Sequence, residues 1–251
     1  MDLQLSGRRV IVAGGSRGIG RSIALAFAQA GAAVSICARG AAALEATRAE
    51  IAAHGHPTHA ASCDLADAAA IAAYVPAAAA ALGGIDILVN NASGFGRGDD
   101  EESWAASLSV DLMAAVRASQ QAMPFLMQGT QPSIIHIASG SGLNPSVRTP
   151  AYGAAKAAVI HYTRTQAATL ARHGIRVNCV APGSIEFPGG SWERRKTEDP
   201  KLYNGILNSM PAGRLGRPEE VASVVLFLAS SMAIWVTAQI ISVNGGQGFG
   251  R

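Results

Sequence analysis

Short apolar runs alternate with segments of helical pattern along nearly the whole chain. Strands that alternate with helices pair in parallel, because each helix carries the chain back across the sheet before the next strand begins. The alternation predicts an α/β fold with a doubly wound parallel sheet, three layers (α/β/α), and ligands bound at the carboxyl ends of the strands. The chain has 251 residues, 49% of them hydrophobic, and we expect it to form a single domain, residues 1–251.

The predicted strands are 8–13, 32–38, 57–62, 85–89, 133–138, 174–181 and 239–244. The predicted helices are 21–30, 41–54, 67–82 with a break or kink at Pro76, 103–127, 152–172 and 218–229.

A glycine-rich turn, Gly14-Gly-Ser-Arg-Gly-Ile-Gly20, joins the first predicted strand to the first predicted helix. In a strand-turn-helix unit, backbone amides and the positive end of the helix dipole receive a phosphate group. The position directly after the first strand favours a Rossmann dinucleotide site over an ordinary tight turn. The cofactor-binding residues that this turn predicts are Gly14, Ser16, Arg17, Gly18, Ile19 and Gly20.

Arginines indicate which nicotinamide dinucleotide binds. The second predicted strand ends at Ala38 and Arg39, where an acidic residue would bind the ribose of NAD and an arginine accommodates the 2′-phosphate of NADP. Arg17 and Arg39 form a candidate clamp on that phosphate; the alternative is that both are ordinary surface residues. The predicted cofactor is therefore NADP(H). Asp64 either caps the next helix or meets the adenine, and Leu65 beside it is assigned to the same adenine site.

The candidate reactive groups are Ser139, Tyr152 and Lys156. Tyrosine and lysine four positions apart lie on one helical face, one turn from each other. A phenol that exchanges a proton near neutral pH needs a fixed positive charge beside it, which Lys156 supplies, while Ser139 hydrogen-bonds a carbonyl or alcohol oxygen. The alternative is a chance spacing on a solvated helix edge.

The stretch 184–213 is irregular and polar and lies beside this edge, so we expect a substrate-binding lid rather than a linker.

Composition narrows the class of protein. The net charge is only +3 and the basic residues are scattered, which argues against a nucleic-acid surface. The 3 cysteines lack metal-ligand spacing, so we expect free thiols and no metal site. The N-terminus lacks a signal-peptide pattern and no apolar run could span a bilayer, so we expect a cytoplasmic protein with no membrane partner.

Taken together, the chain resembles the short-chain dehydrogenase/reductase family over essentially its whole length, and within it the 3-oxoacyl-acyl-carrier-protein reductases. The resemblance implies that Tyr152 is the general acid for carbonyl reduction or the base for alcohol oxidation, that Ser139 positions the substrate oxygen, and that Lys156 lowers the tyrosine pKa and binds the nicotinamide ribose. It also implies a homotetramer that packs through helices 103–127 and 152–173. The matching positions are 14–20, Asn90-Asn-Ala92, Ser139, Tyr152, Lys156, Asn178, Pro182-Gly183 and 213–222, and the further cofactor residues that it implies are Asn91, Ala92, Ser93, Pro182, Gly183 and Ile185.

Some positions depart from the family pattern. Asp111 stands where an asparagine usually supports a water-mediated proton relay. An aspartate pairs with Lys156 and preserves the relay, although its charge raises the pKa of Tyr152; the alternative is a helix residue that pairs with Arg117 or caps locally. Ser93 takes a place usually held by glycine, and must adopt that backbone position.

Phe187 replaces a threonine that commonly binds the nicotinamide carboxamide, so we expect Phe187 or Trp192 to meet the substrate, a small-molecule carbonyl compound or alcohol, together with Phe95 and Ser141. These residues predict an NADP(H)-dependent oxidoreductase that transfers a hydride between nicotinamide and a carbonyl or secondary alcohol. Two alternatives remain: a reductase of 3-oxoacyl thioesters, and a catalytically weak NADP-binding sensor or assembly protein.

Overall fold

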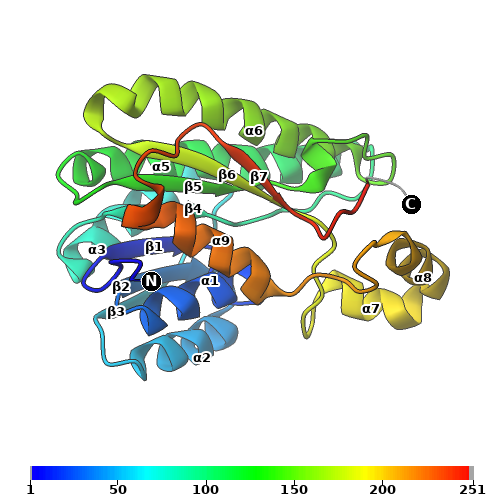
Figure 1. The fold of residues 1–251 in the computed structure, drawn as a ribbon, viewed down its shortest axis with the longest axis horizontal. Helices are drawn as coiled ribbons and strands as arrows, with labels where there is room; N and C mark the ends of the chain where they lie inside the picture. Colours follow the sequence, from blue (N-terminus) through cyan, green and yellow to red (C-terminus); the bar gives the residue numbers. More distant parts are fainter. Residues whose placement is uncertain (1, 249–251) are drawn as a thin grey trace.

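The structure, a computed structural model, describes residues 2–248, so Met1 and 249–251 of the expected domain lie outside the described residues. Within that range seven parallel strands form one sheet in the order β3-β2-β1-β4-β5-β6-β7 (Figure 1). The predicted doubly wound sheet is confirmed. The strands are β1 (Arg9–Ala13), β2 (Ala33–Ala38), β3 (Thr58–Ser62), β4 (Ile87–Asn90), β5 (Ser133–Ile137), β6 (Arg176–Pro182) and β7 (Ile240–Val243).

The strand order reverses at β1, which pairs with β2 on one side and β4 on the other, with Ala13 opposite Cys37 and Asn90. Because the connections after β1 and β4 leave in opposite directions, a crevice opens at their carboxyl ends. The glycine-rich turn and Asn91 both lie there, so the topology places the predicted cofactor site at this crevice.

Helices cover both faces of the sheet (Figure 1). Alternate residues of β1 point to opposite layers: Val10 and Val12 pack with α1 (Gly18–Gln29), α2 (Ala41–Ala52) and α9 (Pro218–Ala229), whereas Ile11 and Ala13 pack with α3 (Ala68–Leu82), α5 (Ala114–Leu126) and α6 (Pro150–Leu170). This period-2 alternation buries the sheet on both sides, as expected for parallel strands. No helix among residues 2–248 is long and apolar enough to cross a bilayer.

The helix predicted at 67–82 differs from the expectation in its capping and its continuity. Its N-cap is Asp67, which accepts from Ala69 N at 2.8 Å, whereas Asp64 accepts from Ala66 N before the helix begins. The predicted break at Pro76 is wrong, since α3 continues through it. Pro76 lies on the exposed face, where water can satisfy the carbonyl that its missing N–H leaves free.

The stretch predicted as one helix at 103–127 consists of three elements: α4 (Glu101–Ala106), a π-helical segment η1 (Ser107–Met113) and α5. The segment predicted to be irregular at 184–213 also contains two helices, α7 (Ser191–Glu198) and α8 (Pro200–Ser209), which lie beside the main body (Figure 1). Asp199 caps α8 by accepting from Leu202 N at 3.0 Å. Polar composition concealed these helices because they lack a continuous buried face.

Candidate active site

Ser139, Tyr152 and Lys156 meet at the carboxyl edge of the sheet. Ser139 lies two residues after the end of β5, and the other two lie in the first two turns of α6. The Lys156 Nζ atom lies 5.6 Å from the centre of the Tyr152 ring and donates a hydrogen bond to Ile137 O at 2.9 Å. Lys156 is buried and Tyr152 is half-buried, so the phenol stays accessible above a cation withdrawn from solvent.

Opposing contributions set the pKa of Tyr152, and the result is raised above the ordinary value. Burial raises the pKa most, the Lys156 ammonium lowers it, the Asp111 carboxylate raises it, and a hydrogen bond with Ser139 lowers it. In the unliganded chain the phenol therefore holds its proton at neutral pH, which is the form that a general acid needs.

Asp111 is buried in η1 and ion-pairs with Lys156, with Oδ1 3.2 Å from Nζ. Burial is the largest influence and lowers the pKa of Lys156, but the attraction and hydrogen bond of Asp111 together with the attraction of Tyr152 outweigh it, so the lysine pKa is raised and the ammonium is retained. The alternative partner is not used, because Arg117 donates to Ala66 O at 3.1 Å. A π-helical turn, which recurs at functional sites, delivers Asp111 to this position.

The same carboxylate holds the loop after β4. Asp111 Oδ2 accepts from Gly94 N at 3.1 Å and from Phe95 N at 3.2 Å. The positive φ in this loop belongs to Phe95, at +48°, and not to Ser93, which stands where the family usually has glycine. The Phe95 ring meets the Tyr152 ring edge-on, with centroids 4.9 Å apart, so Phe95 lies beside the candidate reactive tyrosine, and its contact with substrate stays a prediction.

The glycine-rich turn presents an uncapped helix end. Arg17 at the N-cap of α1 makes no side-chain capping bond and the first turn of this helix holds no acidic residue, whereas aspartates cap α3, α4 and α8. Asn91 fixes the turn by donating from Nδ2 to Gly14 O at 2.8 Å, and a Cβ at Gly20 would collide with that carbonyl. Free amides and a compact turn fit the pyrophosphate of a nicotinamide dinucleotide.

The other predicted cofactor residues line the same edge at several points. Arg17 lies in the turn after β1, Arg39 directly follows β2, and both side chains are exposed, so binding of a 2′-phosphate by the two together stays a prediction. The roles predicted at the adenosine also stay predictions, for Ser16, Ile19, Asp64 and Leu65. Ala92 packs against Gly14. Gly183 N donates to Val243 O at 3.0 Å, which extends the pairing of β6 with β7 by one step past Pro182.

Two further residues support the carboxyl edge of the sheet. The sequence did not point to Gln247, and it gave Asn178 only as a position that matches the family. Gln247 Oε1 accepts from Ser184 N at 2.8 Å and so holds the chain just before the buried Ile185. Asn178 bridges from β6 to the segment before β7, by donating to Val236 O and accepting from Gln239 N. Nothing local in the sequence signals the Gln247 contact, since it joins positions 63 residues apart.

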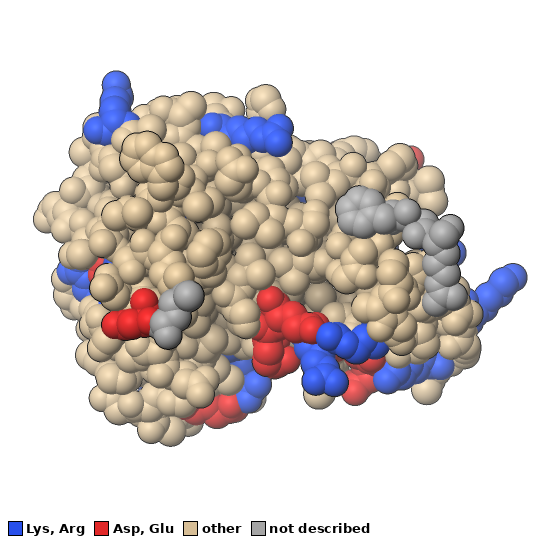
Figure 2. Space-filling model, in the orientation of Figure 1, with Lys and Arg blue, Asp and Glu red and all other residues tan. Residues whose placement is uncertain are grey.

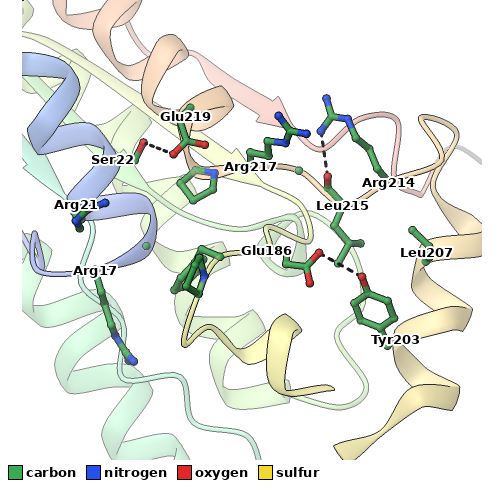
Figure 3. Close-up of a pocket in the computed structure, with 15 residues that line it drawn as sticks. Arg17, Arg21, Ser22, Glu186, Tyr203, Leu207, Arg214, Leu215, Arg217 and Glu219 are labelled. Atoms are coloured by element: carbon green, nitrogen blue, oxygen red, sulfur yellow. Dashed lines mark hydrogen bonds between the residues drawn. The ribbon is translucent and has the colours of Figure 1, made fainter. Parts of the chain in front are cut away.

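A cavity of about 710 Å³ opens between α1, α8 and the segments 186–188 and 214–219 (Figure 3). Tyr203 on α8 points to Glu186 and donates to Oε2 at 3.3 Å, and Ser22 points to Glu219 (Figure 3). Acidic and basic side chains gather where α7 and α8 approach the main body (Figure 2).

Phe187 belongs to this cavity and packs on the glycine-rich turn. A Cβ placed on Gly18, whose φ is +53°, would lie 2.5 Å from Phe187 Cζ, so the ring covers the start of α1. A contact of Phe187 with substrate therefore stays a prediction. Trp192 lies on α7 and Ser141 N donates to Ser139 Oγ at 3.1 Å, which leaves their predicted substrate roles equally open.

Comparison with known proteins agrees with this geometry. Residues 13–247 match the family described as enoyl-(acyl carrier protein) reductase. The chain is 36% identical over 247 residues to the BbsD subunit of (2S)-[(R)-hydroxy(phenyl)methyl]succinyl-CoA dehydrogenase from Thauera aromatica, covering 97% of each. It is 35% identical to the 3-oxoacyl-[acyl-carrier-protein] reductase FabG of Thermotoga maritima, covering 97% of this chain and 99% of that one.

Solved structures are equally similar. A short-chain dehydrogenase from Burkholderia cenocepacia in complex with NADP superposes with a TM-score of 0.89 at 33% identity, covering 97% of this chain and 99% of that one. A 7α-hydroxysteroid dehydrogenase complexed with NADH and 7-oxoglycochenodeoxycholic acid superposes with a TM-score of 0.91 at 32% identity, covering 98% and 96%. The chain belongs to the short-chain dehydrogenase/reductase family, and is an oxidoreductase of the nicotinamide-dependent kind.

Proposed function

We propose that this protein is an NADP(H)-dependent carbonyl reductase or alcohol dehydrogenase in which Tyr152 is the general acid and base. The observation that carries the proposal is the position of Tyr152, between the Lys156 ammonium and Ser139, at the edge where the uncapped glycine-rich turn also lies. Proton donor, oxygen-positioning hydroxyl and phosphate-binding turn thus share one crevice.

When bound, the dinucleotide supplies the hydride, and this chain supplies the proton and the orientation. In reduction, the Tyr152 hydroxyl donates its proton to the substrate oxygen while the Ser139 hydroxyl donates a hydrogen bond to the same oxygen. The phenolate left behind is stabilised by the Lys156 ammonium, whose charge Asp111 maintains. In oxidation the same residues act in reverse, and Tyr152 accepts the proton.

Asp111 is proposed as the relay residue that returns the proton. It contacts Lys156 directly, and it borders a cavity of about 10 Å³ that Asn90 and Ala92 also line. A cavity of that size corresponds to about one water molecule, enough for a single bridging position. The carboxylate thus replaces the family's asparagine without breaking the connection to Lys156.

We propose NADP(H) rather than NAD(H) because Arg39 follows β2 where an acidic residue would mark NAD, and because Arg17 lies at the start of the neighbouring helix α1. The relatives do not decide this choice, since one solved structure holds NADP and another NADH. Gly14, Gly18 and Gly20 would hold the pyrophosphate, and Pro182, Gly183 and Ile185 the nicotinamide side.

A 3-oxoacyl thioester substrate is the second candidate, because the FabG reductase and the succinyl-CoA dehydrogenase subunit are both similar over nearly their whole length. The sensor alternative rests on the departures from the family pattern at Asp111 and Phe187. Its first ground is weakened, since Asp111 is ion-paired with Lys156 rather than detached from the site.

We also propose that the chain self-associates as a homotetramer. Trp235 is 97% exposed and Ile234 is 58% exposed, beside the edge strand β7, and such apolar surface is typical of subunit contacts. Light scattering after gel filtration would give four times the 25.6 kDa chain mass if this is right, and the single chain mass if it is wrong.

The test is oxidation of NADPH with a panel of ketones, aldehydes and 3-oxoacyl thioesters, in the native chain and in Tyr152→Phe. We expect turnover in the native chain and a loss of 10³-fold or more, roughly the contribution of general acid catalysis, in the variant. Tyr162→Phe is the matched control, because Tyr162 lies on the same helix and only accepts from Gln166 at 3.1 Å. Tight NADPH binding without turnover on any substrate would favour the sensor alternative.

A further inference from the structure

Three arginines from separate segments lie near one another, and one of them, Arg97, lies near the Tyr152 ring through Phe95. Arg97 lies in the loop between β4 and α4, Arg148 lies just before α6, and Arg195 lies on α7. We call Arg97, Arg148 and Arg195 the arginine cluster. Arg195 is close enough to the other two for their charges to act on it, and burial first, then repulsion by Arg97 and Arg148, lowers its pKa.

The guanidinium groups of the arginine cluster have no ion-pair partner within residues 2–248, although four acidic residues, 99–102, follow Arg97 in the chain; of these, Asp99 accepts from Trp104 Nε1 and Asp100 caps α4. None of its members forms an ion pair or donates a side-chain hydrogen bond there. The acidic group that acts on Arg195 is Asp199, whose Oδ1 already caps α8. Three neighbouring guanidinium groups repel one another unless an anion joins them.

Contacts with aromatic rings place Arg97 near the Tyr152 ring and Arg195 against the Trp192 ring. The Arg97 guanidinium lies over the Phe95 ring at 5.4 Å, and Phe95 in turn meets the Tyr152 ring at 4.9 Å between centroids. Arg97 is therefore no farther from the Tyr152 ring than the sum of those two distances. Arg195 lies over the Trp192 ring at 4.7 Å. The surroundings of the arginine cluster thus combine flat apolar surface with positive charge.

We propose that the substrate is an anion: a carbonyl compound or alcohol that bears a carboxylate or phosphate group, which the arginine cluster binds while its reacting oxygen reaches Tyr152. This rests on the proposed oxidoreductase function and adds the class of its substrate. Arginine binds carboxylate and phosphate through paired hydrogen bonds, and the Phe95 and Trp192 rings cover the apolar part between the two ends.

The first test compares 5-oxohexanoate with its neutral methyl ester as substrates for NADPH oxidation. We expect kcat/KM for the acid to exceed that for the ester by at least about 10-fold at low salt, the factor of one lost charge-assisted hydrogen bond. We also expect only the acid to lose rate as salt rises. Equal rates for acid and ester, with no salt dependence, would overturn the anion proposal while leaving the oxidoreductase function intact.

Variants assign the effect to the cluster. Arg195→Gln and Arg97→Gln should each reduce the ratio of kcat/KM for the acid to kcat/KM for the ester about 10-fold, and Arg195→Lys should retain part of this preference. Arg172→Gln is the matched control, because Arg172 follows the last turn of α6, about 30 Å along the helix from Tyr152. An acid preference that survives both glutamine variants would contradict the assignment.

Binding without chemistry separates this proposal from the proposed function. Calorimetric titration with glutarate, propyl phosphate and acetyl-CoA tests the carboxylate, the simple phosphate and the nucleotide thioester as sources of the anion. Binding of at least one that weakens about 10-fold in Arg195→Gln supports the proposal even if no carbonyl compound is reduced. Binding of none, or binding equal in native chain and variant, overturns it.

Discussion

Asp111→Asn removes one charge from a buried pair and nearly nothing else, so it isolates the electrostatics of the proposed relay. At 3.2 Å, the attraction between the Asp111 carboxylate and the Lys156 ammonium is about 5 kcal/mol at an effective dielectric constant of about 20. Breaking a buried pair at one end costs about 3–5 kcal/mol, because the remaining charge keeps its desolvation penalty. We expect the free energy of unfolding at pH 7 to fall by about 3 kcal/mol, measured by urea denaturation.

The variant also changes proton affinities at the site. Asp111 raises the pKa of Tyr152, so its removal lowers the pH at which the phenol becomes a base. Alcohol oxidation with NADP should therefore reach its plateau at lower pH in Asp111→Asn than in the native chain. The pH profile of kcat/KM between pH 6 and 10 measures this, in solutions of constant ionic strength.

Asp86→Asn is the matched control for this experiment. Asp86 is likewise buried and ion-paired, with Arg9 at 2.7 Å, but it precedes β4 at the opposite edge of the sheet. It should lower stability and leave the pH profile unchanged. The reasoning is refuted if Asp111→Asn unfolds at the native urea concentration and keeps the native profile.

Three further changes test other parts of the site and fold. Arg39→Asp should shift the ratio of NADPH to NADH affinity towards NADH by about 100-fold, as two charge-assisted hydrogen bonds to a phosphate are lost; equal affinity of the native chain for both dinucleotides would contradict the clamp. Phe187→Thr should tighten NADPH binding by roughly 10-fold in fluorescence titrations, because in the native chain the Phe187 ring packs on Gly18 and binding must first break that apolar contact. An unchanged Kd would show that the ring does not obstruct the turn. Burial raises the pKa of Asp86, but its hydrogen bonds from Arg9 and Thr130 outweigh burial and hold the pKa below the ordinary value. The Asp86 carboxylate therefore stabilises the fold at pH values above its pKa in the unfolded chain, and this stabilisation is lost as the pH falls through its lower pKa in the folded chain. Native and Asp86→Asn chains should differ in free energy of unfolding at pH 7 and converge in acid.

The sequence predicted the parts of the molecule that depend on local pattern. Short apolar strand runs, the Gly14–Gly20 turn and the four-residue spacing of Tyr152 and Lys156 are read from neighbouring residues, and the parallel topology follows from the alternation of strands with helices. Ser139 was predictable as well, since every strand of a doubly wound sheet ends at the same edge.

Other features depend on contacts between distant positions. Phe95 has a positive φ in the loop where Asp111, on a π-helical turn, accepts from the amides of Gly94 and Phe95. The helices α7 and α8 have mostly polar exposed residues and are held to the body through Glu186, Lys196 and Tyr203, a set that no periodicity reveals. The arginine cluster was invisible for the same reason, as its members lie on three separate segments.

The central claim is that Tyr152 gives its proton to a substrate oxygen while a hydride reaches the neighbouring carbon. Single-turnover reduction of a ketone with NADPH deuterated at nicotinamide C4 tests this directly, by mass spectrometry of the alcohol from the native chain and from Tyr152→Phe. The account predicts one deuterium on the alcohol carbon with the native chain and no detectable product with the variant. Deuterated alcohol formed at the native rate by Tyr152→Phe would contradict it.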